Sequence, residues 1–182
     1  MQHVEVERKY AVAEPDALKA VLATHGGVAS TATRQVDDYF NAPHKDFLAP
    51  STITEWVRLR TSEISSFNYK CWHVDSPETR YADEFETPVG NPEAMRKALD
   101  ALGFTLIVTV DKMREAWNLP ALEVAFDTIA GLGEFVEFEF NGDADDPTDA
   151  ILKLESLIAA FNVGLGEQIH RGYPHMLLDR DE

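Results

Sequence analysis

The chain has 182 residues, of which 32 are acidic and 16 basic, so its formal net charge is −16. This length predicts a single domain, residues 1–182, because domains average about 150 residues. The hydrophobic fraction of 45% and the charged fraction of 26% exclude a disordered or low-complexity chain. The acidic balance argues against binding to nucleic acid or to an anionic membrane, since both need a basic surface.

The single cysteine, Cys71, excludes an intrachain disulfide and a cysteine-based zinc site. The first residues show no basic start followed by an apolar run, so we expect no signal peptide. No stretch approaches the roughly 18 consecutive apolar residues of a membrane span. These features predict a soluble protein of the cytoplasm.

Three helices are predicted from capping residues and from apolar residues at helical spacing. The first begins at Glu14 and Pro15, and glycines at positions 26 and 27 end it. The second begins at Asn91 and ends at Gly103. The third begins near Asp146, and its apolar stripe covers residues 151–161.

The remaining segments alternate apolar and polar residues, which is typical of β-strands. Turn residues around Ser62, Ser76 and Pro120 predict three hairpins. The pattern indicates an α+β fold, a mostly antiparallel sheet of about eight strands with helices packed outside. The predicted strands are residues 4–10, 32–40, 53–61, 66–74, 79–88, 104–117, 121–129 and 134–141.

Pairs of like charges lie on one face of these strands, and apolar residues lie on the other. Alternation alone favours a sheet whose charged face is in solvent. Like charges two residues apart repel each other, however, so stability alone does not select them. The acidic pairs are Glu5 with Glu7, Glu84 with Glu86, and Glu137 with Glu139, and the basic pairs are Arg58 with Arg60 and Lys112 with Arg114. Glu123 and Asp127 share one parity four residues apart.

These two kinds of pair suit two kinds of ligand. Arg and Lys donate charge-assisted hydrogen bonds to phosphate groups, so the basic pairs suit an anion with several phosphates. Carboxylate pairs suit a divalent cation such as Mg²⁺. A sheet closed with this face inward would form a charged tunnel, in which such charges interact far more strongly than in water.

Glu5, Glu7 and Lys9 form a Glu-x-Glu-x-Lys motif on the first predicted strand. This motif resembles the hallmark of the CYTH superfamily, the triphosphate tunnel metalloenzymes. Within it the chain is most similar to the class IV adenylate cyclase (CyaB-like) branch. Further motifs follow in the family's order at residues 37–43, 45–47, 57–60, 69–70, 84–86, 111–115, 126–139, 171–173 and 177–178.

The resemblance implies an eight-stranded antiparallel closed β-tunnel, or barrel, that binds a triphosphate together with Mg²⁺ or Mn²⁺. It implies Lys9, Arg58, Arg60, Lys70, Lys112 and Arg114 as phosphate-binding residues and Glu5, Glu7, Asp127, Glu137 and Glu139 as carboxylates that include the metal ligands. Lys9 and Glu137 are the implied catalytic residues, and Glu84, Glu86 and Glu123 are further candidates for the tunnel lining.

The resemblance leaves the reaction open. Cyclisation of ATP to cyclic AMP and pyrophosphate needs nearly the same charged residues as hydrolysis of inorganic, thiamine or nucleoside triphosphate. A non-catalytic polyphosphate-binding module is disfavoured, because anion capture gains nothing from acids beside the site. The chain departs from the family pattern at Cys71 and Gly172, so the substrate beyond its phosphates stays open, as does a homodimer.

Overall fold

The structure is a computed structural model that describes residues 3–12, 14–50, 52–73 and 81–179. Within these ranges the chain forms four helices, α1 (Pro15–Thr24), α2 (Pro92–Ala101), α3 (Pro147–Ala160) and α4 (Tyr173–Leu177). The strands are β1 (His3–Glu5), β2 (Glu7–Ala11), β3 (Val28–Ala29), β4 (Thr33–Asn41), β5 (Glu55–Thr61), β6 (Ser66–His73), β7 (Tyr81–Pro88), β8 (Thr105–Leu119), β9 (Leu122–Ile129), β10 (Gly133–Phe140) and β11 (Gln168–Ile169).

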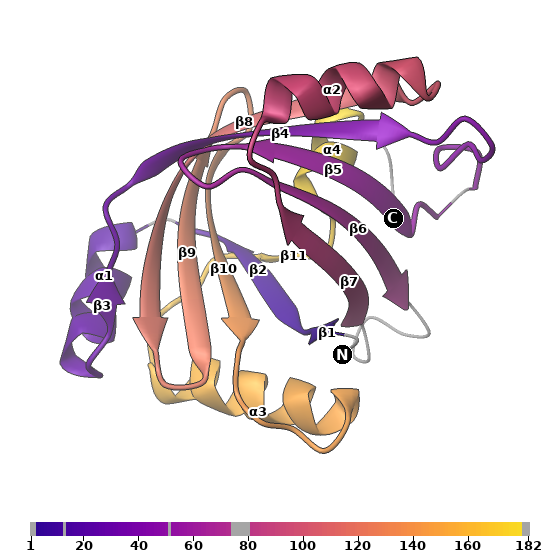
Figure 1. The fold of residues 1–182 in the computed structure, drawn as a ribbon. Helices are drawn as coiled ribbons and strands as arrows, with labels where there is room; N and C mark the ends of the chain where they lie inside the picture. The colour runs from indigo at the N-terminus through magenta and orange to yellow at the C-terminus, as the bar shows by residue number, and fades with distance from the viewer. Residues whose placement is uncertain (1–2, 13, 51, 74–80, 180–182) are drawn as a thin grey trace.

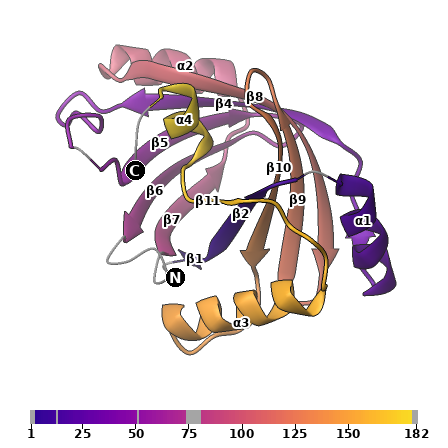
Figure 2. The same cartoon turned by 180° about the vertical axis from the view of Figure 1, so that it is seen from behind.

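One antiparallel sheet curls into a half-barrel with helices outside it (Figures 1 and 2). Its strand order is β1-β7-β6-β5-β4-β8-β9-β10-β2-β11, and β3 pairs with β8. Helices α1, α2 and α3 lie on the convex side, whereas α4 lies against the concave side (Figure 2). The predicted α+β architecture is therefore confirmed.

The prediction of a closed, eight-stranded barrel is wrong in two respects. Among the described residues the hydrogen-bonded ladder does not return to its first strand, and the sheet has eleven strands. The first predicted strand breaks at Val6, so that β1 pairs with β7 and β2 pairs with β10. Val6 is buried, and its carbonyl accepts a hydrogen bond from the Phe140 amide at 3.0 Å. Residues 3–11 therefore bridge β7 and β10, but they do not close the barrel along the whole length of these strands.

The three predicted helices and all eight predicted strands are present, with ends that differ by a few residues. The elements that sequence periodicity missed are β3, β11 and α4, which have only two to five residues each. The predicted turn around Ser76, residue 74 and residues 79–80 lie outside the described residues. None of the helices that the structure describes is long and apolar enough to cross a membrane.

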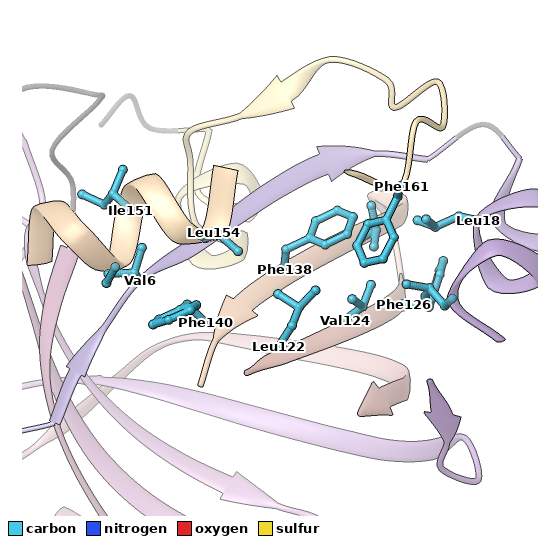
Figure 3. Close-up of a cluster of buried hydrophobic side chains, with 13 residues drawn as sticks. Val6, Leu18, Leu122, Val124, Phe126, Phe138, Phe140, Ile151, Leu154 and Phe161 are labelled. Carbon is cyan, nitrogen blue, oxygen red and sulfur yellow. The ribbon is translucent and has the colours of Figure 1, made fainter. Parts of the chain in front are cut away.

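The largest hydrophobic core lies between the convex face of β9, β10 and β2 and the helices α1 and α3 (Figure 3). Alternation places Val124 and Phe138 on this face, and both are fully buried. Burial of a side chain as large as Phe138 stabilises the fold by about 1.5–3 kcal/mol. Helix α3 begins where the Asp146 carboxylate accepts the Asp149 amide at 2.9 Å, which sets its position along the sheet. The apolar face of the sheet therefore lies on the convex side, and the charged face lies on the concave side.

Candidate functional site

Side chains of the concave face surround a cavity of about 600 Å³, which we call the tunnel cavity. Every predicted site residue except Asp127 lines it, and Asp127 lies directly behind the lining at 1% exposure. These lining residues are Glu5, Glu7, Lys9, Arg58, Arg60, Lys70, Glu84, Glu86, Lys112, Arg114, Glu123, Glu137 and Glu139. The structure therefore brings charged side chains from eight strands to one place.

Strand alternation explains why these side chains point inward. In β5, Val57 and Leu59 are buried in the convex face with Leu99 of α2, so the residues between them face the cavity. Those residues are Arg58 and Arg60, and both line the tunnel cavity.

In β10, Val136 and Phe138 are buried in the convex core, so Glu137 and Glu139 face the cavity. In β8 the alternation holds without such an anchor, because Met113, the residue between Lys112 and Arg114, is exposed.

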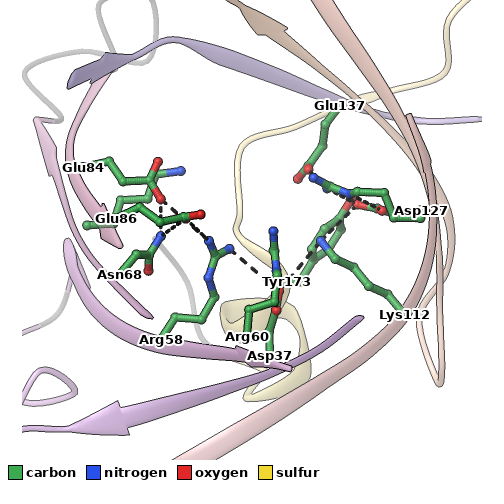
Figure 4. A network of polar contacts seen from close by, with 12 residues as sticks. Asp37, Arg58, Arg60, Asn68, Glu84, Glu86, Lys112, Asp127, Glu137 and Tyr173 are labelled. Carbon is green, nitrogen blue, oxygen red and sulfur yellow. Dashed lines mark hydrogen bonds and ion pairs between the residues drawn. The ribbon is translucent and has the colours of Figure 1, made fainter. Parts of the chain in front are cut away.

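Arg114 is the centre of the first charged group in the cavity, and its neighbours Asp127 and Glu137 are labelled in Figure 4. Its Nε donates to Asp127 Oδ1 at 2.7 Å, and its terminal nitrogen contacts both Asp127 and Glu137. Asp127 also accepts from the Tyr173 hydroxyl at 3.0 Å and lies 3.4 Å from Lys112 Nζ. Burial alone would raise the pKa of Asp127, but the charges of Arg114 and Lys112 outweigh it and hold that pKa below its usual value. Asp127 is therefore ionised and acts as a fixed acceptor for two cations.

A second group surrounds Asp37, a residue of β4 that the sequence motifs contain but that was not predicted as a site residue. Arg60 donates to its two oxygens at 2.7 and 2.8 Å, and Arg58 lies 3.8 Å away. Lys112 Nζ is 3.9 Å from the same carboxylate. Burial opposes ionisation of Asp37, yet these cations lower its pKa well below the ordinary value. Asp37 lies on the same side of β4 as Tyr39, which lines the cavity. This alternation in the sequence of β4 was the signal that could have indicated Asp37 as a site residue.

Lys112 lies between these two groups and is buried. Burial and the neighbouring charge of Arg114 lower its pKa to about 8, although Asp127 and Asp37 act in the opposite direction. Cations are thus packed closely enough to repel one another in the cavity. This arrangement favours an incoming anion that would neutralise several of them together.

The far wall of the cavity is acidic and holds Lys70. Its Nζ lies 2.8 Å from Glu5 and 3.3 Å from Glu7. Burial and the charge of Glu5 raise the pKa of Glu7 to about 7, although Lys70 lowers it. Burial and the charges of Glu5 and Glu7 raise the pKa of Glu139 to about 8. The positive charge of Lys70 therefore does not balance the negative charges of this wall. The wall also includes Glu123, a further neighbour of Glu139.

Two contacts tie Lys9 to α4 and to the residue that leads into it. Lys9 Nζ donates to the Arg171 carbonyl at 3.1 Å and lies 3.8 Å from the centre of the Tyr173 ring. The same Nζ is 3.2 Å from Glu137. Tyr173 is a functional-site neighbour that sequence reasoning missed, because a five-residue helix carries no periodic signal. Asn68 was also missed, although it has the inward parity of Arg58 and donates to Glu84 and Glu86.

The comparisons with known proteins agree with this geometry. The CYTH domain matches residues 3–173. The chain belongs to the CYTH domain family. The predicted superfamily membership is therefore confirmed.

Three relatives of this CYTH domain are named as putative adenylate cyclases, and one of them is also described by a triphosphatase activity. The putative adenylate cyclase MJ0240 of Methanocaldococcus jannaschii is 27% identical over 173 residues, which cover 93% of this chain and 96% of that protein. The solved structure of a putative adenylate cyclase from Vibrio parahaemolyticus has a TM-score of 0.79 at 20% identity and covers 98% of this chain and 99% of that one. A putative adenylyl cyclase from Hippeastrum, HpAC1, described as having a dominant triphosphatase activity, has a TM-score of 0.64 at 14% identity and covers 100% of this chain and 98% of that one.

The triphosphate tunnel metalloenzymes of the CYTH superfamily depend on divalent metal ions. In the present side-chain arrangement, the described residues include no group of three or more His, Cys, Asp or Glu that could hold such an ion. The chemistry of the acidic wall nevertheless fits one, because Glu5 is buried, Glu7 and Glu139 are half-buried beside it, and the pKa values of all three are raised. A divalent cation takes carboxylate oxygens and would remove this repulsion. Asp127 and Glu137 differ from them, because their oxygens already contact Arg114.

Proposed function

We propose that this CYTH domain is a divalent-cation-dependent enzyme that acts on a triphosphate bound in the tunnel cavity. The reaction we favour is that of an adenylate cyclase, in which the ribose 3′ oxygen of ATP attacks the α-phosphorus and pyrophosphate leaves. One observation carries the proposal. Six cationic side chains from four strands converge on one cavity, and the wall of that cavity around Lys70 has an excess of carboxyls.

The cations would bind the phosphates of the substrate. Arg58 and Arg60 present planar guanidinium groups, which bind phosphate oxygens in pairs. Lys112 and Arg114 are neighbours on the inward face of β8 and repel each other, so binding of a polyanion beside them is favoured electrostatically. Because Asp37 and Asp127 hold these cations in place beforehand, little side-chain reorganisation is needed when the substrate enters.

Lys9 and Glu137 are the proposed catalytic pair. Burial disfavours the charged form of Glu137, but Lys9 and Arg114 hold its pKa well below the ordinary value. It therefore stays ionised beside a lysine that the Arg171 carbonyl and the Tyr173 ring also hold in position. Glu5, Glu7 and Glu139 are the residues that would hold the divalent cation. When bound, this cation would neutralise phosphate charge and lower the pKa of the attacking oxygen.

Hydrolysis of a triphosphate by water is the second candidate. All six cations line the tunnel cavity. Inorganic triphosphate would contact them in the same way as a triphosphate ester, and this placement favours hydrolysis as the second candidate. Both reactions would use the same residues to position phosphates and stabilise developing charge. The products distinguish them.

The test incubates the pure protein with ATP, thiamine triphosphate or inorganic triphosphate, each with Mg²⁺ or Mn²⁺, and separates the products by chromatography. Cyclic AMP with pyrophosphate supports the cyclase, and orthophosphate supports the hydrolase. Binding of the triphosphates without any product would contradict an enzymatic role.

Two variants test the site. Arg60→Met removes a cavity cation, and we expect triphosphate turnover to fall at least tenfold. Arg34→Met is the matched control, because Arg34 pairs with Asp111 on the surface at 2.6 Å and does not line the cavity. Equal turnover in both variants would contradict the proposed site.

A further inference from the structure

Tyr173, the first residue of α4, contacts charged side chains of two strands at once. It is buried and lines the tunnel cavity. Its hydroxyl donates to Asp127 Oδ2 of β9 at 3.0 Å (Figure 4). Lys9 Nζ of β2 lies over its ring, 3.8 Å from the ring centre. The two ends of one side chain therefore contact an acid and a base of the site.

These two contacts complete a closed cycle of side chains. Asp127 accepts hydrogen bonds from Arg114, and Arg114 also contacts Glu137. Glu137 lies 3.2 Å from Lys9 Nζ, and Lys9 in turn lies over the Tyr173 ring. The other members of the cycle come from strands of the sheet, so Tyr173 is the member that joins its two ends.

The ring of Tyr173 acts on Lys9. Lysine has a flexible four-carbon side chain, so the contact with Glu137 alone does not fix the direction of its ammonium group. An aromatic face attracts an ammonium group electrostatically, and this attraction is strongest where water is excluded. Lys9 and Tyr173 are both buried, so the ring contact is well placed to hold Lys9 beside Glu137.

The hydroxyl of Tyr173 acts on the phosphate-binding side of the cycle. Burial and the charges of Glu137 and Asp127 raise the pKa of Tyr173 well above its ordinary value, so the hydroxyl keeps its proton and donates it in a hydrogen bond. Asp127 also accepts from Arg114 and lies 3.4 Å from Lys112. Because these two contacts would remain, loss of the hydroxyl alone should disturb the cations only slightly.

We propose that Tyr173 is a positioning residue whose two parts act separately. Its ring orients Lys9 for the reaction, and its hydroxyl orients Asp127 and, through it, the phosphate-binding Arg114. The inference rests on the proposed function, which assigns Lys9 to catalysis and Arg114 to phosphate binding. Because small displacements of a reacting group lower the rate strongly, the ring should affect kcat, whereas the hydroxyl should affect substrate affinity.

Two substitutions separate the two parts. Tyr173→Phe keeps the ring and removes the hydroxyl, whereas Tyr173→Leu removes both. The constants kcat and KM are measured with Mg²⁺ and the triphosphate that the wild type turns over fastest. Binding of inorganic triphosphate is measured by calorimetry without divalent cations. We expect both variants to raise its Kd by about threefold or less, and Tyr173→Phe to keep kcat within about twofold of the wild type. Tyr173→Leu should lower kcat at least tenfold.

Phe161→Leu is the matched control for the loss of a buried aromatic ring. Phe161 belongs to the convex core and does not line the tunnel cavity. We expect this variant to lower Tm but to keep the kcat and KM of the wild type, so a lower Tm by itself does not account for a lower kcat.

NMR of the lysine ε-methylene groups tests the ring contact without turnover. The Lys9 signal, identified by its loss in Lys9→Met, should be shifted upfield by the aromatic ring current in the wild type and in Tyr173→Phe. In Tyr173→Leu this shift should be absent.

The failure of this inference is distinguishable from the failure of the proposed function. If Tyr173→Leu has the kcat of Tyr173→Phe, or if Lys9 shows no ring-current shift in the wild type, the positioning role is overturned and the proposed function stands. If the wild type turns over no triphosphate, the proposed function is wrong and the positioning role is overturned with it.

Discussion

Replacement of Arg114 by methionine should destabilise the protein by about 3 kcal/mol or more. Loss of one partner from a buried ion pair costs about 3–5 kcal/mol, because the other charge stays buried. Asp127 would keep the Tyr173 hydroxyl at 3.0 Å and Lys112 at 3.4 Å, and Glu137 would keep Lys9 at 3.2 Å. Removal of Arg114 would also relieve the repulsion that lowers the pKa of Lys112. These remaining partners place the expected loss at the lower end of the range.

The double variant Arg114→Met with Asp127→Asn should recover most of that loss, because it removes both members of the pair. Urea unfolding at constant m value measures both variants, and the double-mutant cycle gives their coupling. Affinity for inorganic triphosphate should be reduced in both, since neither has the cation. The reasoning is refuted if Arg114→Met unfolds within about 0.5 kcal/mol of the wild type, the range of ordinary surface substitutions, or if the two substitutions are additive.

Three further predictions concern charge, catalysis and capping. Without divalent cations, Tm should fall as pH rises from 6 to 8, because Glu7 and Glu139 bind protons more tightly in the folded state than in the unfolded state. The slope is up to about 1.4 kcal/mol per pH unit for each titrating group, and a Glu139→Gln variant with the wild-type slope would contradict this assignment. Glu137→Gln should abolish metal-dependent turnover in steady-state kinetics while the far-UV circular dichroism stays unchanged; wild-type turnover would exclude a catalytic role. Asn91→Ala removes the acceptor of the Ala94 amide at 2.9 Å and should cost about 1 kcal/mol in urea unfolding without changing triphosphate affinity, and a loss of affinity would show that α2 influences the site.

Much of the site could be predicted from the sequence because strand alternation is a strict geometric rule. In β5, the apolar parity of Val57 and Leu59 determines that Arg58 and Arg60 share the opposite face. Alternation does not say whether that face meets solvent or a cavity. The like-charged pairs and the resemblance favoured a cavity, and the curled sheet provides one.

The remaining features depend on contacts that no local pattern reports. Asp37 and Asp38 are neighbours with opposite roles: Asp37 binds Arg60 inside, whereas Asp38 binds Arg96 of α2 and Thr109 on the convex side. Only the parity of the surrounding strand distinguishes them. Tyr173 reaches Asp127 from a short helix far along the chain, so its role is a result of tertiary packing. The break at Val6 likewise follows from pairing with two distant strands.

That break has a consequence for how the molecule assembles. Residues 3–11 join β7 to β10, so the wall cannot be completed until residues 133–140 are available to pair with them. Pairings of such large sequence separation slow folding, since a long loop must be ordered before they form. Until these two pairings form, the backbone edges of β7 and β10 that they cover are open, and exposed edges are prone to associate with other chains. The same few residues that supply Glu5, Glu7 and Lys9 to the site therefore also protect the nascent sheet against aggregation.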